Sequence, residues 1–179
     1  MYILSGDQIL EHIDNRIIII SPFQTHLLNP SSYYFTLGRI IKVFDAIKSE
    51  SKTINLEDRG EVKIAPNGYL LGNSYETLDL SSSKKVFASF GAPYSLIENG
   101  LLLCHSPTID PYHNDFIQFG IKNLLPIENT IRFQMVIGKA IFFNISESPI
   151  TLHHLSEAFK ASLQKAVTNP LSSEIKLEQ

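Results

Sequence analysis

Short apolar stretches alternate with turn-forming residues along most of this chain. From Ile17–Ile20 onward, such stretches are separated by pairs such as Asn29-Pro30 and Asn99-Gly100. This pattern is typical of β-strands joined by tight turns. The predicted strands are Ile17–Ile20, Thr36–Phe44, Val62–Ile64, Tyr75–Leu80, Val86–Ser89, Leu101–His105, Phe116–Lys122 and, in two parts, Thr130–Asn144. Regular short strands indicate a sandwich or barrel rather than alternating strands and helices.

The two ends of the chain show helical signals instead. Ser5-Gly6-Asp7-Gln8 precedes apolar residues and has the form of a capping box, so it predicts a short helix ending near Asp14-Asn15. Apolar residues recur at helical spacing over Thr151–Val167, namely Leu152, Leu155, Phe159, Leu163 and Ala166. We therefore expect a single mostly β domain over residues 1–179, with its core over about 1–145 and an amphipathic helix over about 151–167.

Composition narrows the possible partners and surroundings. The net charge is −3, which gives no basis for an electrostatic nucleic-acid binder. The single cysteine excludes an intramolecular disulfide, and the apolar start at Met1–Leu4 is followed at once by polar residues. We expect a soluble, cytoplasmic protein with neither a membrane nor a nucleic acid as partner.

Several common catalytic sites are not supported by the residues. A zinc-dependent base deaminase needs His-x-Glu and Pro-Cys-x-x-Cys, which one cysteine cannot supply. His113 and Asp115 could share a metal from one turn, but two ligands do not make a site, so no metal site is predicted. Glycine-rich phosphate loops are absent from the sequence. Cys104 lies in a predicted apolar strand and is expected to be buried and inert.

Ordered motifs give the chain a family resemblance. The motifs are Ile3–Leu10, Leu28–Tyr33 with Leu37-Gly38, Tyr69–Gly72 with Ser74 and Glu76, Ser95-Leu96 with Gly100-Leu101, Ile109-Asp110-Pro111, and Met135-x-Ile137-Gly138 with Phe142. In this order and spacing they resemble the dCTP deaminase and dUTPase superfamily, and the deaminase branch in particular. Tyr34 stands where that family has an aspartate.

The resemblance implies a fold, a reaction and a set of contacts. The fold would be a distorted jelly-roll or β-barrel of the dUTPase-like type, assembled as a homotrimer with deoxyribonucleotide sites between subunits. The reaction would be dCTP + water → dUTP + ammonia, without a catalytic metal and with Mg²⁺ only bridging the triphosphate. The implied nucleotide-binding residues are Tyr94, Ser95, Asp110, Gln118, Phe119 and Lys139.

The catalytic positions of the family are altered here. Counting from Asp110, the family's glutamate base falls on Gly120. Strand alternation places Gln118 and Gly120 on one face, so that face carries no carboxylate. Glu98 replaces an arginine of the phosphate motif and reverses its charge, which disfavours a triphosphate. Asp110 and Glu98 remain as candidate catalytic carboxylates.

Each of these residues also has a structural interpretation. Asp110 would contact the sugar or instead cap its own backbone in an Asp-Pro turn. Glu98 could be a solvated charge, and Lys139 could be an ordinary surface lysine. Gly120 would mark a bulge or the close approach of another backbone, including one from a neighbouring subunit.

Three functions remain open from the sequence. The first is a diverged dCTP deaminase-like protein of pyrimidine deoxynucleotide metabolism, with weak, altered or lost activity. The second is a non-catalytic nucleotide sensor or trimeric scaffold. The third keeps hydrolysis, with Asp110 as the base acting on a monophosphate or a modified nucleotide.

Overall fold

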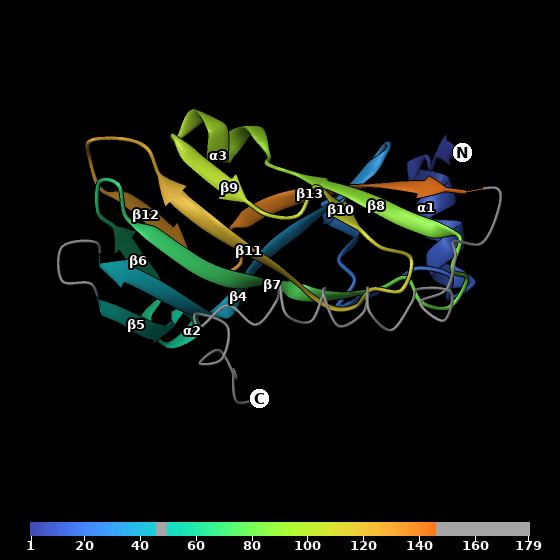
Figure 1. The fold of residues 1–179 in the computed structure, drawn as a ribbon. Coiled ribbons are helices and arrows are strands. Elements are labelled where there is room, and N and C mark those ends of the chain that lie inside the picture. Colours follow the sequence, from blue (N-terminus) through green and yellow to red (C-terminus); the bar gives the residue numbers. More distant parts are fainter. Residues whose placement is uncertain (46–49, 146–179) are drawn as a thin grey trace, which may run out of the picture. The chain divides into compact units, whose positions relative to one another are not determined.

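A curled antiparallel sheet makes up most of the described chain (Figure 1). This computed structural model describes residues 1–45 and 50–145, and the helix predicted over about 151–167 lies outside them. The described residues belong to one compact unit, Met1–Glu147. The mostly β class predicted from the sequence is confirmed.

The strands and helices have the following bounds. The strands are β1 Tyr2–Ile3, β2 Ile19–Ser21, β3 Leu28–Asn29, β4 Ser32–Asp45, β5 Glu50–Asn55, β6 Glu61–Ile64, β7 Tyr69–Asp79, β8 Val86–Gly91, β9 Leu101–Cys104, β10 Thr108–Ile109, β11 Asn114–Asn123, β12 Asn129–Arg132 and β13 Val136–Asn144. The helices are α1 Gly6–Asp14, α2 Leu56–Arg59 and α3 Tyr94–Glu98, with a 3₁₀ turn, η1, at Thr25–Leu27.

Eleven strands share the main sheet, and its order positions every candidate site residue. The path runs β10-β8-β13-β4-β7-β11-β9, while β12 and β6 form a separate pair. The long strand β4 joins the two halves, because it pairs with β13 near its start and with β5 and β7 near its end. At the β9 end of the path, α3 packs against the last strand.

The N-terminal helix forms as its capping box predicts. The Gln8 backbone N–H donates to Ser5 Oγ at 3.3 Å, and the Ser5 backbone N–H donates to Gln8 Oε1 at 3.0 Å. The helix ends at Asp14, with Asn15 as its C-cap. Both boundaries agree with the sequence prediction.

Strand β7 begins at Tyr69, earlier than the predicted Tyr75. Gly72-Asn73 looked like a turn, but the chain stays extended through it and pairs with β11. A Cβ on Gly72 would lie 3.3 Å from side-chain carbons of both Leu37 and Ile41. The glycine therefore makes room for β4 side chains within a continuous strand.

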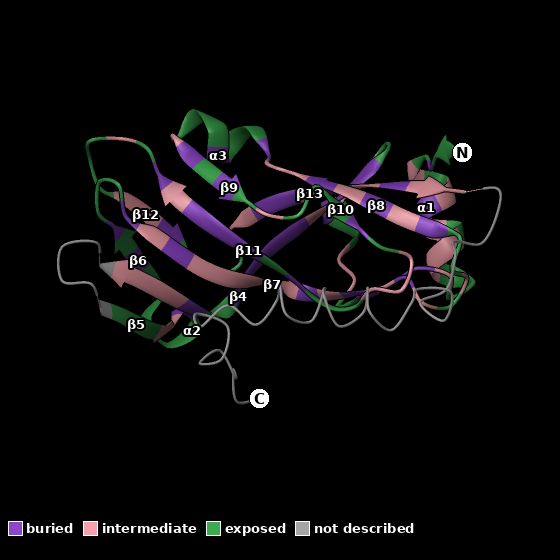
Figure 2. Cartoon of the chain, viewed as in Figure 1, coloured by how far each residue is buried: buried purple, intermediate pink, exposed green. Residues whose placement is uncertain are grey.

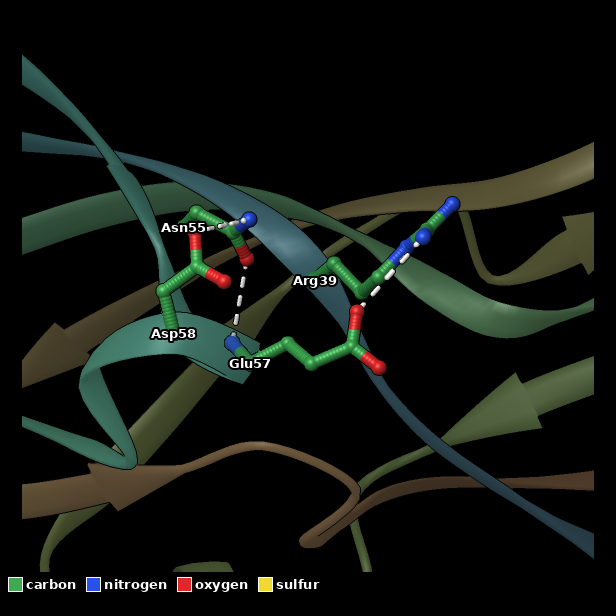
Figure 3. A network of polar contacts seen from close by, with 4 residues as sticks. All are labelled: Arg39, Asn55, Glu57 and Asp58. Atoms are coloured by element: carbon green, nitrogen blue, oxygen red, sulfur yellow. Dashed lines mark hydrogen bonds and ion pairs between the residues drawn. The ribbon is translucent and has the colours of Figure 1, made fainter.

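The short helix α2 and strand β5 were not predicted. Asn55 caps α2, because its Oδ1 accepts a hydrogen bond from the Glu57 backbone N–H at 3.0 Å (Figure 3). Arg39 reaches Glu57 at 3.5 Å, and Asn55 reaches Asp58 at 2.7 Å. The side chains of Arg39 and Glu57 are 62% and 51% exposed, so this ion pair adds little stability.

The core lies on the inner face of the curled sheet. Buried and partly exposed residues alternate along β7 and β8, as in a sheet with one buried face (Figure 2). Aromatic rings connect several strands inside the core: Tyr33 lies 5.3 Å from Phe35, and Phe35 lies 6.0 Å from Phe90 between ring centroids. Edge-to-face pairs of this kind add to the stability gained from burial.

Gly138 lies directly beneath the Phe90 ring. A Cβ on Gly138 would come within 1.9 Å of Phe90 Cζ, and both residues are buried. Gly91, on the neighbouring strand, is different: no atom lies within 4 Å of a Cβ built there. The two glycines form a matched pair for measuring the effect of the ring.

Gly138→Ala is expected to destabilise the fold by about 1–3 kcal/mol, because the added methyl group overpacks the core. Gly91→Ala should change the free energy of unfolding by less than about 0.5 kcal/mol. Chemical denaturation followed by circular dichroism would measure both. Equal effects of the two substitutions would contradict the packing of Phe90 on Gly138.

Candidate functional site

Gly120, the position where the resemblance places a catalytic glutamate, lies on the outer face of β11. Its cross-strand partners are Leu71 on β7 and Cys104 on β9. On the opposite face, Phe119 and Ile121 are buried in the core. The predicted alternation is therefore confirmed, with Gln118 and Gly120 on one face.

The phenol of Tyr69 fills the space that a side chain at position 120 would need. A Cβ built on Gly120 would lie 2.0 Å from the Tyr69 hydroxyl oxygen, 2.4 Å from its Cζ and 2.6 Å from its Cε2. Contacts this short are not found for real Cβ atoms, so the ring must move before any side chain can be added. With Tyr69 in this place, residue 120 has to be glycine.

This contact gives a different explanation of Gly120 from the two that the sequence suggested. The bulge in β11 lies between Phe116 and Gln118, not at Gly120. Within the described chain, the group that approaches Gly120 is the Tyr69 side chain. An aromatic residue lying across a neighbouring strand's glycine is a known means of stabilising a sheet.

Tyr69 is held in a half-buried position. Its ring centroid lies 5.8 Å from that of Phe44 on β4, with the planes tilted by 42°. Burial, and to a smaller extent the negative charge that Cys104 can carry, raise the pKa of the Tyr69 hydroxyl. The phenol therefore stays protonated near neutral pH and can donate a hydrogen bond.

Cys104 is exposed, so the prediction that it is buried was wrong. In β9, Leu101 and Leu103 point into the core, and Leu102 and Cys104 point outward. The run Leu101–Cys104 is apolar throughout, so its letters do not show the alternation of buried and exposed residues. A strand at the end of a sheet can carry leucine on its exposed face as well.

The two candidate catalytic carboxylates are both on the surface. Asp110 follows β10 in a turn, where its backbone oxygen accepts a hydrogen bond from the His113 N–H at 3.0 Å. Within the described residues its carboxylate does not form the predicted cap. Glu98 is the exposed last residue of α3. Neither carboxylate is held in a defined position by the described chain.

His113 and Asp115 do not form a metal site. The His113 ring is bonded through Nε2 to the backbone oxygen of Asp115 at 3.0 Å, not to its carboxylate. No group of three or more metal-binding side chains lies together within residues 1–45 and 50–145.

The implied nucleotide-binding residues are spread across the sheet. Lys139 on β13 pairs with Tyr34 and Gly91, whereas Gln118 is on β11. Strands β4 and β7 lie between β13 and β11, so Lys139 and Gln118 are on strands three positions apart along the curled sheet.

The remaining four positions do not close this gap, and one of them, Asp110, lies in the turn after β10, which pairs with β8. Tyr94 and Ser95 are on α3, against the outermost strand β9. The Phe119 ring is only 3% exposed and packs in the core, so only its backbone is left for a ligand. One chain alone therefore does not assemble the predicted set.

A buried carboxylate, Glu76 on β7, was named only as part of a motif. It is fully buried and accepts hydrogen bonds from the Thr36 backbone N–H and hydroxyl, each at 2.8 Å, and from the Gln24 amide at 3.3 Å. Burial raises its pKa, against the effect of these donors. Glu76 thus connects β7 to β4 and to the segment before η1, which is a structural role.

Comparisons with known proteins agree with the motif resemblance. A family model described as dCTP deaminase-like matches residues 3–145. A protein of Pseudarthrobacter chlorophenolicus named "dCTP deaminase, dUMP-forming" is 25% identical over 159 residues, which cover 82% of each chain. A protein of the same name from Tropheryma whipplei is 27% identical over 157 residues, covering 80% of this chain and 79% of its own.

The fold also has a counterpart among solved structures. The crystal structure of the 2′-deoxycytidine 5′-triphosphate deaminase from Agrobacterium tumefaciens aligns with a TM-score of 0.66 and 11% identity over 91% of this chain. This chain spans about half of that structure, 52% of its length. This likeness confirms the predicted curled β fold. No helix among the described residues is long and apolar enough to span a membrane. By its family model, the chain belongs to the dCTP deaminase-like family.

Proposed function

We propose that this protein is a nucleotide-binding member of pyrimidine deoxynucleotide metabolism that does not deaminate dCTP at the rate of the family's enzymes. The observation that carries the proposal is the Tyr69 phenol lying on Gly120, where the resemblance places the general base. Glycine at this position offers no proton acceptor. The loss of a general base typically slows a reaction by 10²–10⁴-fold, on the order of the effect expected here.

Tyr69 does not replace the missing carboxylate. A general base must accept a proton from water, but the raised pKa of Tyr69 keeps its hydroxyl protonated at neutral pH. Asp110 and Glu98 are exposed and lie outside β11, and no hydrogen bond within the described residues orients either carboxylate as a base. The hydrolytic alternative with Asp110 as base gains no support from this geometry.

A homotrimer is part of the proposal. The separation of Lys139 from Gln118 within one chain supports a site completed by a neighbouring copy. The exposed apolar side chains of Tyr94 and Ile97 on α3, 82% and 59% exposed, offer surface for such a contact. If the ligand is a triphosphate, Mg²⁺ would enter with its phosphates.

The test is an assay of the purified protein with dCTP, dUTP, dCMP and CMP in the presence of Mg²⁺, following ammonia and phosphate. We expect dCTP deamination at least about 100-fold slower than that of a dUMP-forming relative assayed alongside. We also expect a nucleotide to raise the melting temperature, because a ligand that binds only the folded state stabilises it.

Two results would contradict this proposal. Ammonia release from dCTP at the relative's rate would show that catalysis does not depend on a carboxylate at position 120. A folded trimer whose melting temperature no nucleotide changes would instead favour a scaffold. Sedimentation velocity on the same sample measures the oligomeric state independently.

A further inference from the structure

The outer face of the sheet around Gly120 combines aromatic and basic side chains. In one cross-strand row, Phe44, Tyr69 and Lys122 are direct neighbours on β4, β7 and β11. In the next row, Lys42, Leu71 and Gly120 are neighbours on the same three strands. We call these six residues the Gly120 face.

The Gly120 face is positively charged although the chain carries a net charge of −3. Lys42 and Lys122 are its two charged residues, and none of the six is acidic. The outward residues that the flanking strands β5 and β9 add to these two rows, such as Thr53 and Leu102, are uncharged. Charge complementarity therefore favours an anionic ligand on this face.

The two lysines lie on either side of β7, Lys122 across from Tyr69 and Lys42 across from Leu71 in the next row. Two strand spacings across the sheet and two residues along the strands separate the lysine backbones by roughly 12 Å. Lys122 Nζ donates to the Asn67 backbone oxygen, and an ammonium group has three N–H donors. Lys42 Nζ lies 5.6 Å from the centre of the Phe44 ring. Both side chains are partly exposed and keep donors for a phosphate between them.

The surface between the lysines suits a planar ring. Tyr69 covers Gly120 and stays partly exposed beside Phe44, so two aromatic rings line the middle of the face. Any nucleobase can stack on such rings, because every base has a π-face. The exposed amide of Gln118, on the same face of β11, can donate to and accept from a base edge.

We propose that the Gly120 face binds a mononucleotide, with its phosphate held by Lys42 and Lys122 and its base against Tyr69. This inference rests on the proposed function in that it takes the ligand to be a nucleotide. It adds that two lysines outside every family motif hold the phosphate, in place of the arginines that the α3 segment lacks. It also makes Tyr69 a contact for the base.

Isothermal titration with dUMP would test the lysines. The double variant Lys42→Gln/Lys122→Gln is expected to raise the Kd for dUMP by about 100-fold, roughly tenfold for each charged hydrogen bond lost. Lys85→Gln, which removes an exposed lysine away from this face, should leave it unchanged. Inorganic phosphate should bind more weakly than dUMP, because it cannot use Tyr69. Melting temperatures verify that each variant is folded.

Three results of the titration would overturn this inference. They are equal dUMP affinity in the double variant and the wild type, binding of oligo(dT) in a parallel titration without binding of dUMP, and no binding of dUMP by the wild type. The ammonia assay decides none of these results. Slow deamination of dCTP could therefore be found even if the Gly120 face does not bind a nucleotide. Conversely, fast deamination of dCTP with a lysine-dependent dUMP site would leave this inference standing.

Cys104 provides a second and independent measurement. It is the single cysteine of the chain, it is exposed, and it is the cross-strand neighbour of Gly120. Saturating dUMP should slow the reaction of its thiol with Ellman's reagent at least several-fold in the wild type, and should have no effect at the same concentration in the double lysine variant. An unchanged labelling rate in the wild type with dUMP bound would place the nucleotide elsewhere and overturn the inference.

Discussion

Gly120→Glu is expected to destabilise the protein by at least about 3 kcal/mol as long as Tyr69 is present. Overpacking a well-filled site typically costs about 1–3 kcal/mol, and a partly buried carboxylate without a partner adds to this. The new Cβ would overlap the hydroxyl oxygen, Cζ and Cε2 of Tyr69, so rotating the hydroxyl alone gives no relief. For a chain of this size, the melting temperature should fall by roughly 6–12 °C.

The effect should depend on Tyr69, which a double-mutant cycle can show. Tyr69→Ala removes the ring and should by itself destabilise the fold by about 1–2 kcal/mol, because Tyr69 is half-buried. In that background Gly120→Glu should cost less than about 1 kcal/mol, giving a coupling energy of about 2 kcal/mol or more between the two sites. Additive effects of the two substitutions would show that Tyr69 is not what excludes a side chain at position 120.

Glu76→Ala is expected to lower the free energy of unfolding by about 3–4 kcal/mol. The substitution leaves the Thr36 N–H, the Thr36 hydroxyl and the Gln24 amide without their acceptor, and each buried unsatisfied group costs about 1–3 kcal/mol before relaxation. At present no buried side-chain polar atom among the described residues lacks a partner. Glu76→Gln keeps the volume and one acceptor oxygen, so it should cost only about 1–2 kcal/mol.

Glu98→Gln serves as the matched control, because Glu98 is exposed at the end of α3. It should change stability by less than about 0.5 kcal/mol. Urea denaturation of the three variants would measure these differences. A loss after Glu76→Ala no larger than that after Glu98→Gln would contradict the structural role of Glu76.

The pH dependence of stability offers a further measurement on Glu76→Gln. The folded state raises the pKa of Glu76 above its ordinary value of 4.5, so the folded protein holds this proton more tightly than the unfolded chain. The contribution of Glu76 to stability is therefore complete below pH 4.5 and declines as the pH rises through the raised pKa. As the pH rises through this range, the free energy of unfolding of the wild type should therefore fall relative to that of Glu76→Gln, which does not titrate. Urea denaturation at several pH values would measure this change.

The sequence predicted the class of fold because the alternation of apolar residues is a local property. Strands such as β11 and β13 have one buried face, so their pattern is visible in the letters alone. Strand β7 was started too late because Gly72-Asn73 has the composition of a turn, while its conformation depends on Leu37 and Ile41 of a distant strand. The exposure of Cys104 likewise depends on β9 being at the end of the sheet path.

The candidate site was harder to predict because it depends on register between strands. The absence of a carboxylate at Gly120 could be read from the sequence, but the reason for the glycine could not. Tyr69 reaches Gly120 because β7 and β11 pair in the register that places Tyr69 opposite Lys122 and Leu71 opposite Gly120. The same register brings Lys42 and Lys122 to either side of β7, and no local pattern shows that two lysines so far apart in the chain share one face.

The contact between Tyr69 and Gly120 also bears on how a lineage could change at this position. A substitution that placed glutamate at residue 120 would have to displace the Tyr69 ring from its place beside Phe44, and the loss of stability would lower the amount of folded protein before any gain in catalysis. The reverse route has to begin at Tyr69, where a smaller residue brings no catalytic benefit of its own. A side chain at position 120 can therefore enter only after Tyr69 has become smaller, so the order of the two substitutions decides which sequences are accessible.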